Sequence, residues 1–210
     1  MNRIPPALLI TTASALAACT PADEDGPAQD EQQQAEEVLE ASQPDDCLLM
    51  VWSNQEERDL DFDRANDLVD GGAISCATGT SPSQFEAALA ALREAAKSGD
   101  RARLLEQVGI PLLYIDKDGE RVELDQDQIE ALFDEVFDDE LMGLLGRLDL
   151  KDMTVAEQGG FFELGSVWLV VDKEGSKPRL VTVNRQALEE AAEAARRAAE
   201  DREGETVPIG

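Results

Sequence analysis

The stretch from residue 20 to residue 46, TPADEDGPAQDEQQQAEEVLEASQPDD, holds ten acidic residues, no basic residue and very few apolar side chains. A segment of this composition buries too little apolar surface to offset the entropy of ordering, so we expect a disordered tether. As a flexible coil such a segment spans about 30 Å, and repulsion between its charges extends it further. A folded core in this 210-residue chain therefore has to come from the residues that follow the tether.

The residues before the tether have the features of an export signal. Arg3 gives a positive start, and residues 7–18 are mostly apolar or small but too few to span a bilayer. The quartet LAAC at residues 16–19 resembles the lipobox of bacterial lipoproteins. That resemblance implies that residues 1–18 are removed and that Cys19 becomes a lipidated N-terminus, held on a membrane by about 0.8 kcal/mol per acyl methylene. The alternative is an ordinary signal peptide followed by an unrelated cysteine.

Thr20 follows Cys19, at the position where an aspartate would resemble the inner-membrane retention signal of Gram-negative lipoproteins. By that resemblance we expect a cell-envelope protein, lipid-anchored in the outer membrane and facing the periplasm. The formal net charge of −28 repels anionic polymers and argues against binding to nucleic acid. High solubility or a salty medium explains such a charge, and an acidic face for a cationic partner is the alternative.

Cys47 and Cys76 are the two remaining cysteines. Two thiols in an exported chain usually pair, so we predict a disulfide that closes the segment 47–80. In the chain-entropy model a loop of this length contributes roughly 3–4 kcal/mol to stability. The alternative is a pair of buried free thiols, and the spacing is unlike the CxxC motif of redox catalysts.

The stretch DLDFDRANDLVDG, residues 59–71, matches an EF-hand calcium loop at five positions, Asp59, Asp61, Asp63, Asp67 and Asp70. However, Arg64 stands where the loop needs glycine, and Asp70 replaces the long bidentate glutamate. The simpler interpretation is a helix that ends near residue 71 and has three apolar side chains on one face, Phe62, Ala65 and Val69. We therefore predict no metal site and no cofactor.

Helical patterns begin at residue 81. The letters SPSQ at 81–84 match a capping box with proline at the first helical position, and apolar residues then repeat at helical spacing up to residue 96. Gly99 ends this helix, and Asp100 caps a second one. Asp125 caps a third helix, and a further helical stretch runs to residue 148.

Most of the strand patterns follow these helices. Strands are expected at 112–115 and 121–124, joined by an Asp118-Gly119 turn, and near 150–157, 161–171 and 179–184. Together these elements predict an α+β domain at 81–185, with N-terminal helices packed on an antiparallel sheet. The C-terminal segment 186–210 is Ala-rich, and a helix over 185–202 is expected there, either projecting into solvent or docking a partner.

Seven short motifs follow one another in this domain: Gly99-Asp100, Pro111-Leu112, Asp118-Gly119, Phe133 with Phe137, Gln158-Gly159, Gly165-Ser166-Val167-Trp168 and Thr182-Val183-Asn184. Their order resembles that of small exported bacterial proteins of the nuclear-transport-factor-2-like, or cystatin-like, superfamily. The resemblance implies a sheet curled into a cone, with a cavity between sheet and helices. Candidates to line it are Tyr114, Phe133, Phe137, Met142, Phe161, Phe162 and Trp168. The alternative is that these side chains simply fill a packed core.

The sequence contains no histidine, which excludes Ser-His-Asp and Cys-His catalysis and imidazole zinc sites. No catalytic residue of the superfamily maps onto this chain. We therefore expect a non-enzymatic envelope lipoprotein that binds a small apolar ligand or a protein partner. One alternative is a cofactor-free enzyme of the isomerase or hydratase type that uses a buried carboxylate and Tyr114. Another is an acidic inhibitor of a cationic, envelope-attacking enzyme.

Overall fold

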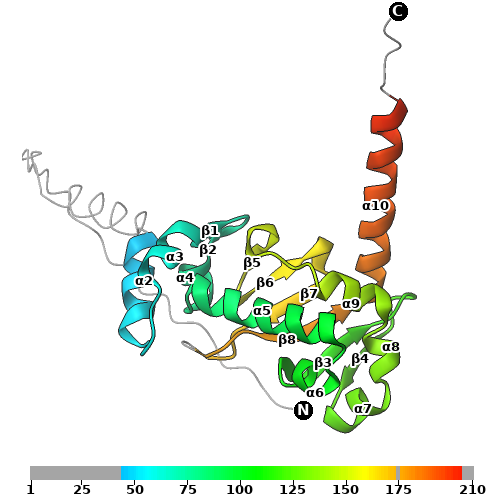
Figure 1. Ribbon diagram of the computed structural model, residues 1–210, viewed down its shortest axis with the longest axis horizontal. Coiled ribbons are helices and arrows are strands. Elements are labelled where there is room, and N and C mark those ends of the chain that lie inside the picture. Colours follow the sequence, from blue (N-terminus) through cyan, green and yellow to red (C-terminus); the bar gives the residue numbers. More distant parts are fainter. Residues whose placement is uncertain (1–43, 174–175, 205–210) are drawn as a thin grey trace, which may run out of the picture. The chain divides into compact units, whose positions relative to one another are not determined.

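The fold is a mixed α+β arrangement in which helices pack against a six-stranded sheet (Figure 1). It is seen in a computed structural model that describes residues 44–173 and 176–204. The expected signal at 1–18, the lipidation residue Cys19 and the tether up to residue 43 lie outside the described residues.

The six-stranded sheet is mixed. Its strand order is β4-β3-β8-β7-β6-β5, made of β3 (Val108–Ile115), β4 (Arg121–Leu124), β5 (Thr154–Ala156), β6 (Gly159–Phe162), β7 (Val167–Val170) and β8 (Arg179–Asn184). Neighbouring strands are antiparallel except β3 and β8, which run parallel. The expected purely antiparallel sheet is therefore wrong at this pair. The reason is that the chain enters β5 in the same direction as β4, and three reversals then bring β8 back alongside β3.

Helices cover one face of this sheet. They are α5 (Pro82–Ser98), α6 (Arg101–Leu105), α7 (Gln126–Ala131), α8 (Phe133–Val136) and α9 (Asp139–Leu145). One cluster of buried apolar side chains joins α5 and α9 to the inner side chains of β3, β6, β7 and β8. Phe85, Leu89 and Leu92 of α5 belong to this cluster, as their helical spacing predicts.

The first described segment packs beside α5. It contains α2 (Pro44–Ser53), α3 (Leu60–Asn66), a two-stranded hairpin of β1 (Leu68–Val69) and β2 (Gly72–Ala73), and α4 (Ile74–Thr78). The disulfide expected from the sequence joins α2 to α4, with 2.06 Å between the sulfur atoms of Cys47 and Cys76.

The acidic stretch 59–71 folds into α3 and β1 rather than into one continuous loop. Asp59 caps α3 by accepting a hydrogen bond from the Phe62 backbone, and no cluster of metal-ligating side chains occurs within the described residues. The helix expected there is shorter than predicted, because it ends at Asn66 and Val69 lies in β1. Its buried residue is Asp63 rather than an apolar side chain.

Three local expectations need correction. Strand β3 begins at Val108 rather than at residue 112 and continues through the Ile110–Pro111 bond. The single strand expected at 161–171 is split into β6 and β7 by a 3-10 turn, η2 (Glu163–Gly165). Ser81 is the N-cap of α5, but its side chain makes no capping hydrogen bond because it pairs with Gln55 instead.

The C-terminal helix α10 (Arg185–Gly204) changes character along its length. Arg185, Ala187, Leu188 and Ala191 are buried, whereas residues 193–200 are exposed. The helix therefore packs through its first turns and then extends into solvent. No helix among the described residues combines the length and the apolar character needed to cross a bilayer.

Candidate functional site

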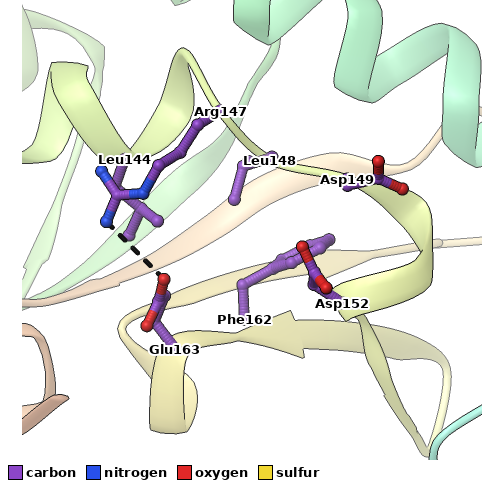
Figure 2. A pocket seen from close by; sticks show the side chains of 7 residues that line it. All are labelled: Leu144, Arg147, Leu148, Asp149, Asp152, Phe162 and Glu163. Carbon is purple, nitrogen blue, oxygen red and sulfur yellow. Dashed lines mark ion pairs between the residues drawn. The ribbon is translucent and has the colours of Figure 1, made fainter. Parts of the chain in front are cut away.

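A cleft of about 400 Å³ opens between the end of α9 and the end of β6 (Figure 2). Two neighbouring segments of the chain form it, one from the end of α9 to the 3-10 turn η1 (Leu150–Asp152) and one at the start of η2. The residues that line it are Leu144, Arg147, Leu148, Asp149, Asp152, Phe162 and Glu163.

The floor of the cleft is apolar. Leu144 lies in the last turn of α9, and Leu148 lies just after that helix. Phe162 lies on the core face of β6, where it pairs with Val167. These three side chains also belong to the main core cluster. A ligand that enters the cleft therefore meets the edge of the protein core.

The rim of the cleft is charged. The Arg147 guanidinium lies 3.6 Å from the Glu163 carboxylate, and Figure 2 shows this pair on one side of the cleft with Asp152 on the other. Asp149 is engaged locally, because one of its carboxylate oxygens accepts a hydrogen bond from the Lys151 backbone at 3.0 Å. The rim thus combines three carboxylates with one guanidinium.

The backbone at this rim is unusual. Glu163, Leu164 and Gly165 follow one another at φ values of 46°, 57° and 89°, all in the left-handed region. Each non-glycine residue there costs of order 1–3 kcal/mol, so surrounding contacts have to hold the turn. The buried Ser166 does this, because its backbone N–H and its hydroxyl both donate to the Phe162 and Glu163 carbonyls. Backbone strain of this kind gathers at functional sites, which marks Glu163 as a candidate binding residue.

The structure places the seven predicted lining residues in several different surroundings. Phe162 lines the cleft. Phe133 and Phe137 are buried in the core with ring centroids 5.0 Å apart, and Tyr114 and Met142 pack partly buried against that core. The structure therefore does not gather these side chains around one cavity.

Phe161 and Trp168 lie on the opposite face of the sheet from Phe162. Successive side chains of a strand point to opposite faces, and Phe161 pairs directly with Trp168 across β6 and β7. Their rings stack at 4.7 Å. These two aromatic residues therefore face away from the helices and cannot line a cavity between helices and sheet.

Tyr114 lacks the acidic partner that the enzymatic alternative needs. Burial, and then the nearby Glu135 carboxylate, raise the pKa of its phenol above 10.0, so the hydroxyl stays protonated at neutral pH. Within the described residues no carboxylate is hydrogen-bonded to this hydroxyl.

The buried ionisable groups serve other parts of the fold. Asp63 accepts hydrogen bonds from the Trp52 indole at 2.7 Å and from the Ser83 backbone at 2.8 Å. Arg185, almost fully buried, pairs with Asp138 and Glu140 at 2.5 and 2.9 Å. Sequence reasoning missed both clusters, because their members lie 11 to 47 residues apart and carry no local signal.

Comparison of the chain with known protein families, with curated proteins and with solved structures finds no match. The chemistry of the cleft is then the guide to its use. Sites for small molecules are usually lined mostly by apolar side chains with a few polar groups, whereas four of the seven residues that line this cleft are charged. Both cysteines near the folded part are joined in a disulfide, so neither supplies a free thiol nucleophile.

Proposed function

We propose that the protein is a lipid-anchored envelope protein whose folded part binds a small apolar ligand in the cleft beside Phe162, without catalysis. The anchor is supported by the LAAC quartet at 16–19 and by the long acidic segment that separates it from the fold. A finer part of the proposal is that the sheet curls around its helices as a cone. The shared apolar core of helices and sheet supports this arrangement.

The apolar floor of the cleft carries the proposal. Leu144, Leu148 and Phe162 reach the cleft but are almost fully buried, so an apolar ligand gains about 25 cal/mol mainly for each Å² of its own surface removed from water. The Arg147–Glu163 pair across the rim is long and largely exposed, and pairs of this kind contribute about 0–1 kcal/mol. The rim can therefore rearrange around a ligand at little cost.

A neutral apolar dye tests the cleft. N-phenyl-1-naphthylamine should bind with saturable 1:1 fluorescence enhancement, and Phe162→Ala should weaken binding about tenfold. Phe161→Ala is the matched control, because it removes the neighbouring ring on the other face of the sheet. Asp152→Trp fills the mouth from an exposed position and should block the dye without touching the core. Equal loss in the Phe161 and Phe162 variants, or undiminished binding to Asp152→Trp, contradicts the proposed site.

The anchor is tested separately by fractionating cells that express Cys19→Ser. The variant should leave the membrane fraction, because the acyl chains that hold the protein require that sulfur. A chain with Cys47→Ser and Cys76→Ser should remain membrane-bound, which controls for the loss of cysteine. Retention of Cys19→Ser in membranes would count against the anchor while leaving the cleft to be judged by dye binding.

A further inference from the structure

A second groove, of about 530 Å³, lies between α3, α5 and the segment that follows α9. Its lining residues are Phe62, Asn66, Glu86, Arg93, Lys97, Gly146, Arg147, Leu148, Asp149, Leu150 and Lys151. It shares Arg147, Leu148 and Asp149 with the first cleft but has its own walls, which come from α3 and α5.

The groove is basic in a strongly acidic protein. Four cationic side chains line it, Arg93, Lys97, Arg147 and Lys151, against two carboxylates, although the chain as a whole has a net charge of −28. Cations that are gathered in a concave site focus their field on its interior. The local charge of this groove is therefore opposite to that of the molecule.

Two of these four cations are paired, Arg93 with Glu86 and Arg147 with Glu163 of the first cleft. Glu86 pairs with Arg93, whose guanidinium also donates to the Leu148 carbonyl at 2.8 Å. Asp149 uses one oxygen to cap the Lys151 backbone. Among the described residues, the ammonium groups of Lys97 and Lys151 have no hydrogen-bond or ion-pair partner.

Apolar side chains form the floor beneath these charges. Leu148 and Leu150 are buried, and Phe62 is half-buried against the core. A ligand that fits both features has an anionic head and an apolar body. The ammonium groups would make charge-assisted hydrogen bonds to the head, and the floor would shield the body from water.

We propose that this groove binds a soluble amphiphile whose head is a phosphate or a carboxylate, held by Lys97 and Lys151 with the body against Phe62 and Leu150. The acidic remainder of the surface selects for a small ligand. A nucleic acid or an anionic bilayer would extend beyond the groove and meet repulsive charge, whereas a single head group does not. This site adjoins the cleft beside Phe162, but Lys97, Lys151, Phe62 and Leu150 belong to the groove alone, and the inference does not rest on the proposed function.

Titration calorimetry on the Cys19→Ser chain with octyl phosphate tests the proposal. Lys97→Gln with Lys151→Gln should weaken binding at least about tenfold, because both head-group contacts are removed. The matched control is Lys173→Gln with Lys177→Gln, which makes the same charge change at exposed lysines outside the groove and should change affinity less than about twofold. Thermal melts establish that all variants are folded.

The choice of probe distinguishes the parts of the ligand. Inorganic phosphate should bind more weakly than octyl phosphate, and octyl glucoside, which has the same chain and no charge, should bind more weakly still. Unchanged affinity in the Lys97/Lys151 variant, or equal affinity for octyl glucoside, overturns the proposal. So does binding to vesicles of anionic phospholipid without binding to octyl phosphate. A loss of octyl phosphate binding in Phe162→Ala alone would assign the ligand to the first cleft and would also overturn it.

Discussion

The segment 44–80 and the domain that begins at Ser81 are stabilised in different ways. Nine polar or charged residues are buried in the described part of the chain, and seven of them lie between Gln55 and Ser81. The main apolar cluster, by contrast, takes only Ile74 from before Ser81. The first segment is thus attached to the domain largely through hydrogen bonds, and the disulfide joins two of its own helices, α2 and α4. The domain from Ser81 is stabilised by apolar packing.

This difference affects how each region tolerates change. The Asp63 carboxylate links α2 and α3 to the start of α5 through Trp52 and Ser83, and Gln55 adds a bond to Ser81 at 3.0 Å. A buried polar network of this kind is sensitive to the loss of a partner, because an unpaired buried group bears its desolvation cost. Among the described residues the Gln55 side-chain oxygen already lacks a hydrogen-bond partner. Apolar packing fails more gradually, in proportion to the volume that is lost.

The largest effect on stability is expected in the domain that begins at Ser81. Leu89 of α5 is fully buried, so Leu89→Ala should lower the free energy of unfolding by about 3–5 kcal/mol, measured by urea denaturation. Leu68→Ala is the control, because Leu68 lies in the segment 44–80 and is 69% exposed. This substitution should lower the free energy of unfolding by less than about 0.5 kcal/mol. Comparable losses in both variants would mean that the buried core around α5 is not what stabilises the domain.

A smaller effect is expected in the polar region. Asp63→Ala leaves the Trp52 indole and the Ser83 amide as buried donors without an acceptor, at a cost of about 2–3 kcal/mol. In a Trp168→Phe background Trp52 is the single tryptophan, so its fluorescence reports the first segment alone. Asp61→Ala removes the same charge from an exposed position of α3 and should leave that signal unchanged.

A further result would distinguish the two kinds of stabilisation. If Asp63→Ala released the first segment while the domain from Ser81 stayed folded, the Trp52 transition would occur at a lower urea concentration than the global transition. Coincident transitions would show instead that the polar network and the apolar core unfold as one unit.

Local signals in the sequence predicted much of the helical structure. Gly99 ends α5 with φ near 67°, and Asp100 caps α6 through the Arg103 amide, as expected for these residue types. Asp125 caps α7 in a complete capping box with Gln128. Each of these features depends on residues at most four positions apart, which is why a single sequence is sufficient to predict them.

Features that depend on distant residues were not predictable in this way. The parallel pairing of β3 with β8 depends on the direction in which the chain enters β5. The partners of Arg185 are 45 and 47 residues away. Leu164 adopts a left-handed conformation that its residue type does not favour, so its sequence gives no signal for the turn beside the cleft.

The smallest effect is expected for Tyr114, which lies on the core face of β3. Four charged groups act on its phenol there: Glu135, Arg185, Asp116 and Asp138. Because burial raises the pKa of its phenol above the ordinary value of 10.0, the folded state favours the neutral form more than the unfolded state does. The resulting contribution to stability is complete below pH 10 and is lost as pH rises through the raised pKa. At neutral pH the ionisation of Tyr114 should make no pH-dependent contribution to stability.

Tyr114 is the only tyrosine in the chain, so absorbance near 295 nm follows its ionisation without interference from other phenols. The folded protein should titrate at a higher pH than the same chain in concentrated urea. Above pH 10 the free energy of unfolding of the wild type should fall more steeply than that of Tyr114→Phe. The lysines titrate in both proteins, so subtracting one curve from the other leaves the contribution of Tyr114. Titration at the same pH in the folded and unfolded chains would mean that water reaches the phenol freely. The core face of β3 would then be exposed to solvent at Tyr114, and this residue would not belong to the apolar packing of the domain.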